Sequence, residues 1–287
     1  MRRRLLPMSV DASPGTREKA LRLRALADSS LLVLPNAWDA GSAAVIASTG
    51  APVVATTSGG VAWSLGRGDG QHASREAMVA AARRVVAAVD VPVTVDAEGG
   101  YGAEPDAVAT TVTALVAAGA VGANLEDSRA VGGPLFSADD QAARLRAARE
   151  AATSAGLPEF WLNARTDVFL FGIGEPEDRL ADVLLRAKAY AAAGADGIFV
   201  PGLLDLDALR ELCAASPLPV NAMLVPGGPT VPELAATGVR RVSAGTALAQ
   251  SAYGAARQAA AELLGPGTLT SLDAGLGFGE LNGLFDA

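Results

Sequence analysis

An acidic, glycine-rich run directly after a strand-like segment is the part of this sequence best suited to chemistry. Residues 91–94 are apolar or β-branched, and Asp96-Ala97-Glu98-Gly99-Gly100-Tyr101-Gly102 follows them. If Asp96 ends a strand, the two-residue period puts the side chains of Asp96 and Glu98 on one side, while the glycines let the backbone turn. Glu126, in Leu125-Glu126-Asp127, ends another apolar segment. We therefore expect the three carboxylates of Asp96, Glu98 and Glu126 to converge on one cation.

Carboxylates held close together favour a divalent metal ion as their partner. Two such groups repel each other or share a proton unless a cation neutralises them. Oxygen ligands completed by water suit Mg²⁺, with Mn²⁺ as the alternative. Asp69, in a loop rich in glycine, is expected to contact the waters of that metal ion. The leading interpretation is a magnesium-dependent enzyme.

Composition excludes several classes of protein. The chain has 287 residues, is 50% apolar and carries a formal net charge of -8, with no basic stripe beyond Arg2-Arg3-Arg4. This balance argues against a nucleic acid or an anionic membrane as partner. No apolar segment reaches the roughly 20 residues of a membrane span, and the apolar stretch after residue 4 is too short for a signal peptide. We expect a cytoplasmic protein.

The residue types in short supply narrow the chemistry further. Cys213 and His72 are the only cysteine and histidine, so a zinc site built from these ligands is excluded by count. His72 lies in a loop, where an exposed or capping histidine is favoured over a catalytic one. Cys213 and Lys188 lie in helical patterns, which disfavours a thiol nucleophile and a Schiff base. Carboxylates, Arg, Asn, Ser and Tyr remain for chemistry.

The order of the predicted elements indicates a parallel α/β barrel. Ala-rich helical stretches, glycine turns and short strands rich in Val, Leu and Ile alternate along the chain. The predicted strands cover residues 31–35, 52–56, 92–96, 122–126, 160–165, 197–200, 219–222 and 241–243. The predicted helices cover residues 40–49, 75–89, 105–118, 139–155, 177–193, 205–215, 230–237 and 246–264. Gly50, Gly119, Gly194 and Gly238 are expected to end helices just before a strand.

Eight strands alternating with eight helices predict a single-domain (β/α)8 TIM barrel over residues 30–264. Residues 1–29 are expected to form an N-terminal extension and helix, and residues 265–287 a C-terminal extension. A doubly wound open sheet is the alternative, but no glycine-rich dinucleotide loop follows the first strand.

Polar residues at other strand ends are candidates for binding a substrate, because reactive groups of such barrels follow the strands. Ser58, Gly59 and Gly60 follow the second strand and could donate to a carboxylate or keto oxygen, or form only a flexible turn. Arg165 ends the fifth strand and could clamp a substrate carboxylate, or form a structural salt bridge with Asp167 or Glu126. Asn221 ends the seventh strand and could bind a second carboxylate oxygen or cap the loop.

These motifs together resemble the isocitrate lyase and phosphoenolpyruvate mutase superfamily over about residues 30–264. The motifs that carry the resemblance are Pro35-Asn36-Ala37-Trp38-Asp39, Ser58-Gly59-Gly60, Asp96-Ala97-Glu98-Gly99-Gly100-Tyr101-Gly102, Leu125-Glu126-Asp127 and Ala164-Arg165-Thr166-Asp167. The resemblance implies a Mg²⁺-dependent barrel that acts on small 2-oxo or 2-hydroxy carboxylates, making or breaking a C–C or P–C bond next to a metal-stabilised, pyruvate-type enolate.

The resemblance also implies roles for individual residues. Asp96 would hold the metal ion directly, and Asp69, Glu98 and Glu126 mostly through water. Ser58, Gly59, Gly60 and Arg165 would clamp the substrate. The family further implies homotetramers in which neighbouring subunits exchange their last barrel helix, here about residues 246–264.

One departure from the family directs the choice of reaction. Family lyases carry a Lys-(Lys or Arg)-Cys-Gly-His loop after the Glu-Asp pair, but residues 128–136 contain no Cys, Lys or His. Glu98 also stands where many members have Asp. We therefore favour chemistry that needs little general acid, such as decarboxylation of an oxaloacetate-like 2-oxo diacid, with Arg165, Tyr101 and Glu126 as the catalytic groups and water or Tyr101 protonating the enolate. A phosphonopyruvate-type P–C mutase or hydrolase is the second hypothesis, and a non-catalytic barrel that binds a keto acid or a protein partner is the third.

Overall fold

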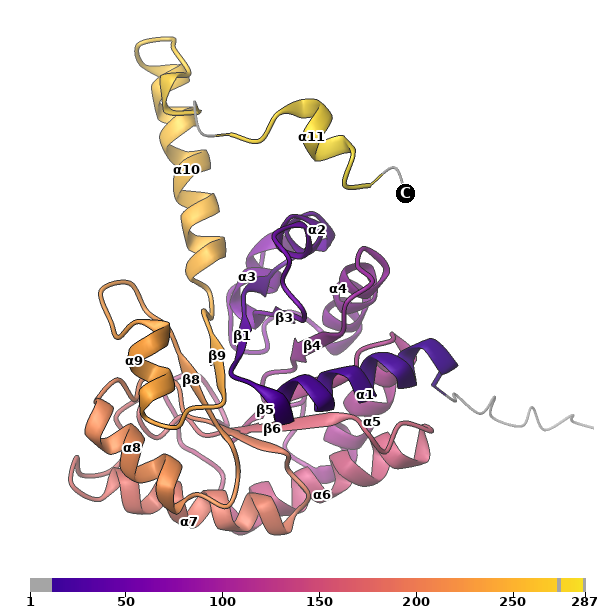
Figure 1. Ribbon diagram of the computed structural model, residues 1–287, viewed down its shortest axis with the longest axis vertical. Helices are drawn as coiled ribbons and strands as arrows, with labels where there is room; N and C mark the ends of the chain where they lie inside the picture. Colours follow the sequence, from indigo (N-terminus) through magenta and orange to yellow (C-terminus); the bar gives the residue numbers. More distant parts are fainter. Residues whose placement is uncertain (1–11, 273–274, 286–287) are drawn as a thin grey trace, which may run out of the picture.

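Nine short parallel strands form one sheet that curls into a nearly closed barrel (Figure 1). The computed structural model describes residues 12–272 and 275–285. Within these residues the strands are β1 (Leu32–Leu34), β2 (Asn36–Ala37), β3 (Val54–Thr56), β4 (Val93–Asp96), β5 (Gly122–Glu126), β6 (Trp161–Arg165), β7 (Gly197–Phe199), β8 (Val220–Met223) and β9 (Arg241–Ser243). The predicted TIM-barrel fold is confirmed.

The predicted first strand, residues 31–35, corresponds to β1, and a second short strand, β2, follows it after Pro35. β1 pairs with β9, with Leu34 opposite Ser243, whereas β2 pairs with β3, with Asn36 opposite Ala55. Proline has no N–H to donate and is confined to edges and breaks in a sheet. The prediction of a strand within residues 31–35 is confirmed by β1, whereas β2 was not predicted. The break lets one segment join both ends of the sheet.

Helices follow the strands as predicted, with small shifts at their ends. Those of the barrel are α2 (Ala40–Ser48), α4 (Arg75–Ala87), α5 (Pro105–Ala117), α6 (Ala138–Ser154), α7 (Arg179–Ala192), α8 (Leu206–Ala215), α9 (Val231–Ala236) and α10 (Ala247–Leu264). The four predicted terminating glycines all have φ between 88° and 97°. Only glycine adopts this left-handed conformation without strain.

Further helices lie outside that alternation. α1 (Pro14–Ser29) begins at Ser13, whose side chain accepts a hydrogen bond from the Thr16 amide, and it crosses the amino-terminal end of the barrel (Figure 1). α3 (Ser58–Ser64) replaces the expected glycine turn after β3. A 3-10 turn η1 (Thr270–Leu272) and α11 (Phe278–Asn282) follow the barrel. No helix of the described residues is long and apolar enough to cross a membrane.

The last barrel helix, α10, stands away from the barrel that it follows in sequence (Figure 1). Of its residues only Ala249 and Ala259 are buried, and Leu264 is 88% exposed. On the outer face of β1, Val33 is 38% exposed although the side chains on either side of it are buried. Exchange of this helix between subunits stays a prediction.

Candidate active site

Asp96, the last residue of β4, lies at the centre of the polar end of the barrel. Its amide donates to Thr56 Oγ1 over 3.0 Å, and its Oδ2 accepts a hydrogen bond of 3.2 Å from the Ser58 amide. The second oxygen, Oδ1, is buried and has no hydrogen-bond partner among the described residues. A buried carboxylate oxygen without a donor is costly, so it indicates a missing ligand.

Two loops are locked together beside Asp96 through three residues in the left-handed conformation. Gln71, Glu98 and Tyr101 have φ of 62°, 49° and 61°, and they are the only non-glycine residues with positive φ in the described chain. The Gln71 amide donates to Glu98 Oε2, the Tyr101 amide donates to Gln71 Oε1 over 2.8 Å, and the Tyr101 hydroxyl donates to Glu98 Oε1 over 3.0 Å. Strained residues persist where surrounding contacts fix them, commonly at functional sites.

Arg165, which ends β6, connects the carboxylates of three strands. Its Nη1 lies 3.1 Å from Glu126 Oε2 and 3.9 Å from Asp96 Oδ2, and its Nε donates to Asp167 Oδ1 over 2.6 Å. The predicted structural salt bridges of Arg165 are therefore present. Among the described residues Nη2 makes no hydrogen bond, which leaves one arm of the guanidinium for a ligand.

Burial and mutual repulsion raise the pKa values of the carboxyl groups of Asp69, Glu98 and Glu126. Burial, followed by the charge of Asp96, raises the pKa of Glu98 to about 7, although Tyr101 and Gln71 oppose the rise. Burial raises the pKa of Glu126 to about 8 despite Arg165. The pKa of Asp69 is raised by burial and by Asp96. Burial alone would lower the pKa of Arg165, but Glu126, Asp167 and Asp96 raise it, so this side chain stays charged.

The expected convergence of three carboxylates on one cation is not seen. No group of three Asp, Glu, His or Cys side chains within residues 12–272 and 275–285 is close enough to hold a metal ion. The reason is local, since Arg165 lies between Asp96 and Glu126, and Glu98 is bonded to Gln71 and Tyr101.

The residues still fit a divalent cation bound directly by one carboxylate. Asp96 Oδ1 is free to ligate, and neighbouring carboxyl groups with raised pKa would gain from a nearby positive charge and could contact its waters. This arrangement is the one that the family resemblance implies for Asp96, Glu98, Glu126 and Asp69.

The proposed substrate clamp after β3 is buried at the start of α3. Ser58, Gly59 and Gly60 are all buried, and the Ser58 amide is occupied by Asp96. A Cβ on Gly59 would lie 2.9 Å from Thr246 Cγ2 and 3.1 Å from Asp69 Oδ2, and one on Gly60 would lie 2.8 Å from Trp38 Cβ. Close packing therefore requires both glycines. Their contact with a substrate stays a prediction.

Asn221 lies in the interior of the barrel. Its Oδ1 accepts a 3.0 Å hydrogen bond from Asn163 Nδ2, which also donates to Asn124 Oδ1 over 2.9 Å. Its own Nδ2 donates to the Ala222 carbonyl over 2.7 Å. The side chain is 1% exposed and its polar atoms are used within the protein. The structure thus does not bring Asn221 to the carboxylate cluster.

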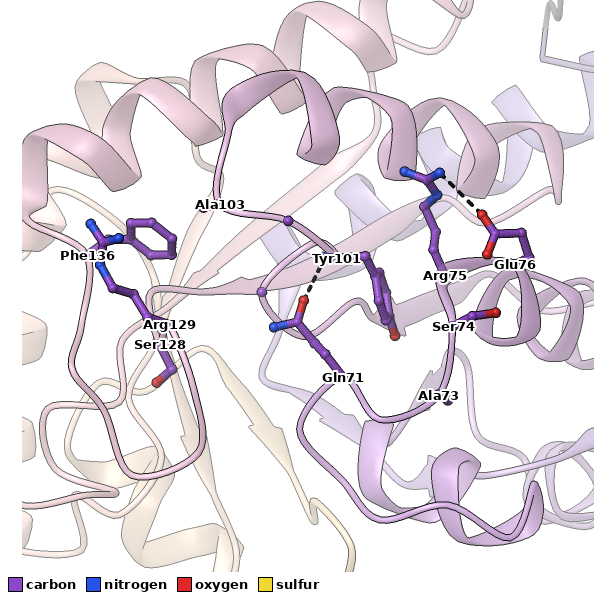
Figure 2. Close-up of a pocket in the computed structure, with 12 residues that line it drawn as sticks. Gln71, Ala73, Ser74, Arg75, Glu76, Tyr101, Ala103, Ser128, Arg129 and Phe136 are labelled. Atoms are coloured by element: carbon purple, nitrogen blue, oxygen red, sulfur yellow. Dashed lines mark hydrogen bonds and ion pairs between the residues drawn. The ribbon is translucent and has the colours of Figure 1, made fainter.

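A cavity of about 650 Å³ lies beside the cluster, between the loops that follow β3, β4 and β5 (Figure 2). Gln71 and Tyr101 form the wall on the side of Glu98, and Arg129 stacks on Phe136 with its guanidinium 4.0 Å from the ring centroid. The loop of residues 128–136 is a small hairpin, in which Ser128 pairs with Leu135. This hairpin follows the Glu126-Asp127 pair, where the resemblance implies a Cys-bearing loop in the family lyases.

Sequence reasoning missed two residues that organise the site. Gln71 was not predicted as a site residue, yet it makes hydrogen bonds to both Glu98 and Tyr101. The neighbouring His72 is exposed. Arg144 on α6 donates to the carbonyls of Gly99, Gly102 and Ala103 and so holds the loop that carries Tyr101. A lone Gln or Arg in a loop or helix carries no motif, so only the fold reveals these roles.

Comparison with known proteins identifies the family of this barrel. Residues 23–264 match the phosphoenolpyruvate phosphomutase family. The chain belongs to the isocitrate lyase/phosphoenolpyruvate mutase superfamily. Its relatives in this superfamily carry out more than one reaction.

The similar proteins are named for three different reactions. A crystal structure from Burkholderia cenocepacia J2315, provisionally assigned as a phosphonomutase, has 47% identity and a TM-score of 0.80 over 84% of this chain and 98% of that one. The 2-methylisocitrate lyase of Escherichia coli is 30% identical over 76% of this chain and 72% of its own. The oxaloacetate decarboxylase of a Bradyrhizobium strain is 35% identical over 48% of this chain and 46% of its own.

Proposed function

We propose that this superfamily member is a Mg²⁺-dependent carbon–carbon lyase or decarboxylase that acts on a small 2-oxo diacid of the oxaloacetate type. The observation that carries the proposal is the unpartnered, buried Oδ1 of Asp96 amid carboxyl groups with raised pKa and next to Arg165. A divalent cation bound there would supply a Lewis acid that stabilises negative charge on the substrate oxygens.

The chain's own residues can perform the remaining steps. The free Nη2 of Arg165 would bind a substrate carboxylate and orient the bond to be broken. When carbon dioxide leaves, the electron pair of the broken C–C bond passes into the enolate, and the enolate carbon then takes up a proton. Water or the Tyr101 hydroxyl could deliver this proton, and Glu98, whose Oε1 accepts a hydrogen bond of 3.0 Å from that hydroxyl, would hold it in position.

The hairpin after β5 supports decarboxylation over cleavage of an alkylmalate or isocitrate. Residues 128–136 contain no Cys, Lys or His, and Arg129 is engaged with Phe136 and, at 3.6 Å, with Asp140. Loss of carbon dioxide requires no general acid or base at the departing fragment, so the missing groups are not needed.

Cleavage of a P–C bond is the second candidate, favoured by the 47% identity to the Burkholderia protein. The experiment that separates the two is a turnover assay with oxaloacetate, 2-methylisocitrate, dimethylmalate and phosphonopyruvate, each with Mg²⁺ or a chelator and with an enzyme-free blank. Mg²⁺-dependent release of pyruvate from oxaloacetate supports the proposal. Phosphate release from phosphonopyruvate would favour the second candidate, and no turnover would favour a binding role.

We also propose that α10 packs against a second copy of the chain, within a homotetramer. The exposed α10 and the uncovered Val33 on the outer face of β1 support the contact between subunits, and the number of four comes from the family resemblance. An apolar side chain left open on a barrel strand would be covered by a helix supplied from a neighbour.

A further inference from the structure

A second polar cavity lies at the opposite end of the barrel from Asp96. It has a volume of about 180 Å³ and lies beneath the end of α1, where Ala27 and Asp28 line it. The first residues of several strands form its walls, namely Leu32, Trp161, Gly197 and Arg241, together with Pro219 and the deeper Asn163. Asp96 and Glu126 of the candidate active site end their strands, so the two sites are separated by the barrel interior.

Unpartnered polar atoms gather in the walls of this cavity. Among the described residues, seven buried side-chain N or O atoms lack a hydrogen-bond partner, and four belong to residues that line it: Trp161 Nε1, Asn163 Oδ1, and Nε and Nη1 of Arg241. Arg241 can offer five N–H donors, yet its side chain makes one hydrogen bond, from Nη2 to Thr94 Oγ1 at 3.2 Å. Buried donors are seldom left unpaired, so such a group of them points to a missing ligand.

Arg241 also lacks a carboxylate in direct contact. It is 6% exposed, and although Asp96 acts on its charge from longer range, neither Asp28 nor any other carboxylate of the described residues lies within ion-pair distance of it. Arg240 at the rim donates to the carbonyls of Ala27 and Asp28 and likewise has no carboxylate partner there. Arg24, over the Trp161 ring, is already paired with Asp196. A buried cation without a counter-charge is strongly unfavourable unless an anion accompanies it.

We propose that this cavity binds a small inorganic anion, held by the guanidinium of Arg241 and the indole N–H of Trp161. Water alone could satisfy the donors but would leave the charge of Arg241 unbalanced. The volume is large enough for several water molecules, which leaves room for a halide with some waters that could also serve Asn163 Oδ1. This inference does not depend on the proposed function, because no residue of the candidate active site lines the cavity.

Bromide is the probe for a direct test, because its anomalous scattering distinguishes it from water in crystals of the full-length protein. The expected result is a bromide peak in the cavity against Arg241 and Trp161. Bromide only at exposed surface sites, or an ordered water alone in the cavity, would overturn the proposal.

Thermal unfolding in solution tests the same anion site without crystals. At constant ionic strength, replacing the bulky anion gluconate by chloride should raise the unfolding midpoint by about 2–4 °C at roughly five times the dissociation constant. The response should vanish in Arg241→Met and persist in the exposed control Arg210→Gln. If Arg241→Met does not fold, Trp161→Phe removes one donor and should weaken the chloride response severalfold. A chloride response that is unchanged in these variants would contradict the assignment.

Discussion

Glu126 and Arg165 face each other in the β5–β6 register, and their side chains form an ion pair of 3.1 Å. The same guanidinium reaches Asp96 and Asp167, so one buried cation balances three carboxylates. Charge compensation in this cluster is incomplete without a further cation. A divalent cation that supplied the missing positive charge would both stabilise the barrel and take part in the proposed chemistry.

Removal of the Arg165 charge should destabilise the protein. At about pH 9, where Glu126 is ionised despite its raised pKa, Arg165→Gln leaves the carboxylates of Glu126 and the buried Asp167 without their cation, and we expect the free energy of unfolding to fall by about 3–5 kcal/mol. Adding Glu126→Gln should restore part of this loss, because one uncompensated charge is removed. Urea unfolding of the single and double variants measures the coupling. If the losses in the free energy of unfolding are purely additive, the Glu126–Arg165 ion pair is not the source of the destabilisation.

The pH dependence of the metal-free protein follows from the pKa values of Glu98 and Glu126. Both pKa values are raised, to about 7 and about 8, so the folded state binds more protons than the unfolded state between about pH 4.5 and pH 8. Stability should therefore decrease as pH rises through this window. With a chelator present, the unfolding midpoint should be lower at about pH 8.5 than at about pH 6. The double variant Glu98→Gln/Glu126→Gln should lose most of this difference, and saturating Mg²⁺ should reduce it.

The hydroxyl of Tyr101 is expected to matter for turnover more than for folding. Tyr101→Phe removes one hydrogen bond to Glu98, which should cost about 1 kcal/mol of stability. If the hydroxyl delivers the proton to the enolate, kcat should fall by about 10²-fold with little change in KM. Tyr253→Phe on α10 is the matched control. Unchanged kcat in Tyr101→Phe would assign protonation to water.

The proposed exchange of α10 makes Val33 an interface residue. In an isolated chain, Val33→Glu on a surface that is 38% exposed should change stability by only about 0.5 kcal/mol. If a partner's helix covers β1, the same change should dissociate the assembly. Light scattering coupled to gel filtration measures the mass, with the exposed Leu21→Glu on α1 as control. A monomeric wild type would reject the exchange.

The sequence predicted the barrel because its signals are local and repeated. Helix periodicity, the terminating glycines at Gly50 and Gly119, and the position of Asp96 at a strand end all depend on neighbours in the chain. β2 was missed because two residues are too few to show a strand pattern, and only its pairing with β3 reveals it. α3 was missed because glycine has low helix propensity, and the close packing around Gly60, where a Cβ would lie 2.8 Å from Trp38 Cβ, is visible only in the fold.

The arrangement of the candidate site could be predicted only in part. Asp96, Glu126 and Arg165 were placed correctly at one end of the barrel, but the position of Arg165 between the carboxylates depends on side-chain contacts across three strands. The left-handed backbone at Glu98, which turns its carboxylate to Gln71, has no signature in residue types. The closed hydrogen-bond chain of Asn221 likewise depends on its neighbours in the barrel.

The central claim is that Asp96 anchors a divalent cation required for C–C cleavage. The most direct measurement is the Mg²⁺ dependence of oxaloacetate turnover by the wild type, Asp96→Asn and the exposed control Asp207→Asn, corrected for the enzyme-free reaction at each Mg²⁺ concentration. We predict saturable Mg²⁺ activation in the wild type and Asp207→Asn, and turnover at the level of the blank in Asp96→Asn. Oxaloacetate turnover that survives chelation, or that is equal in Asp96→Asn and the wild type, would contradict the claim.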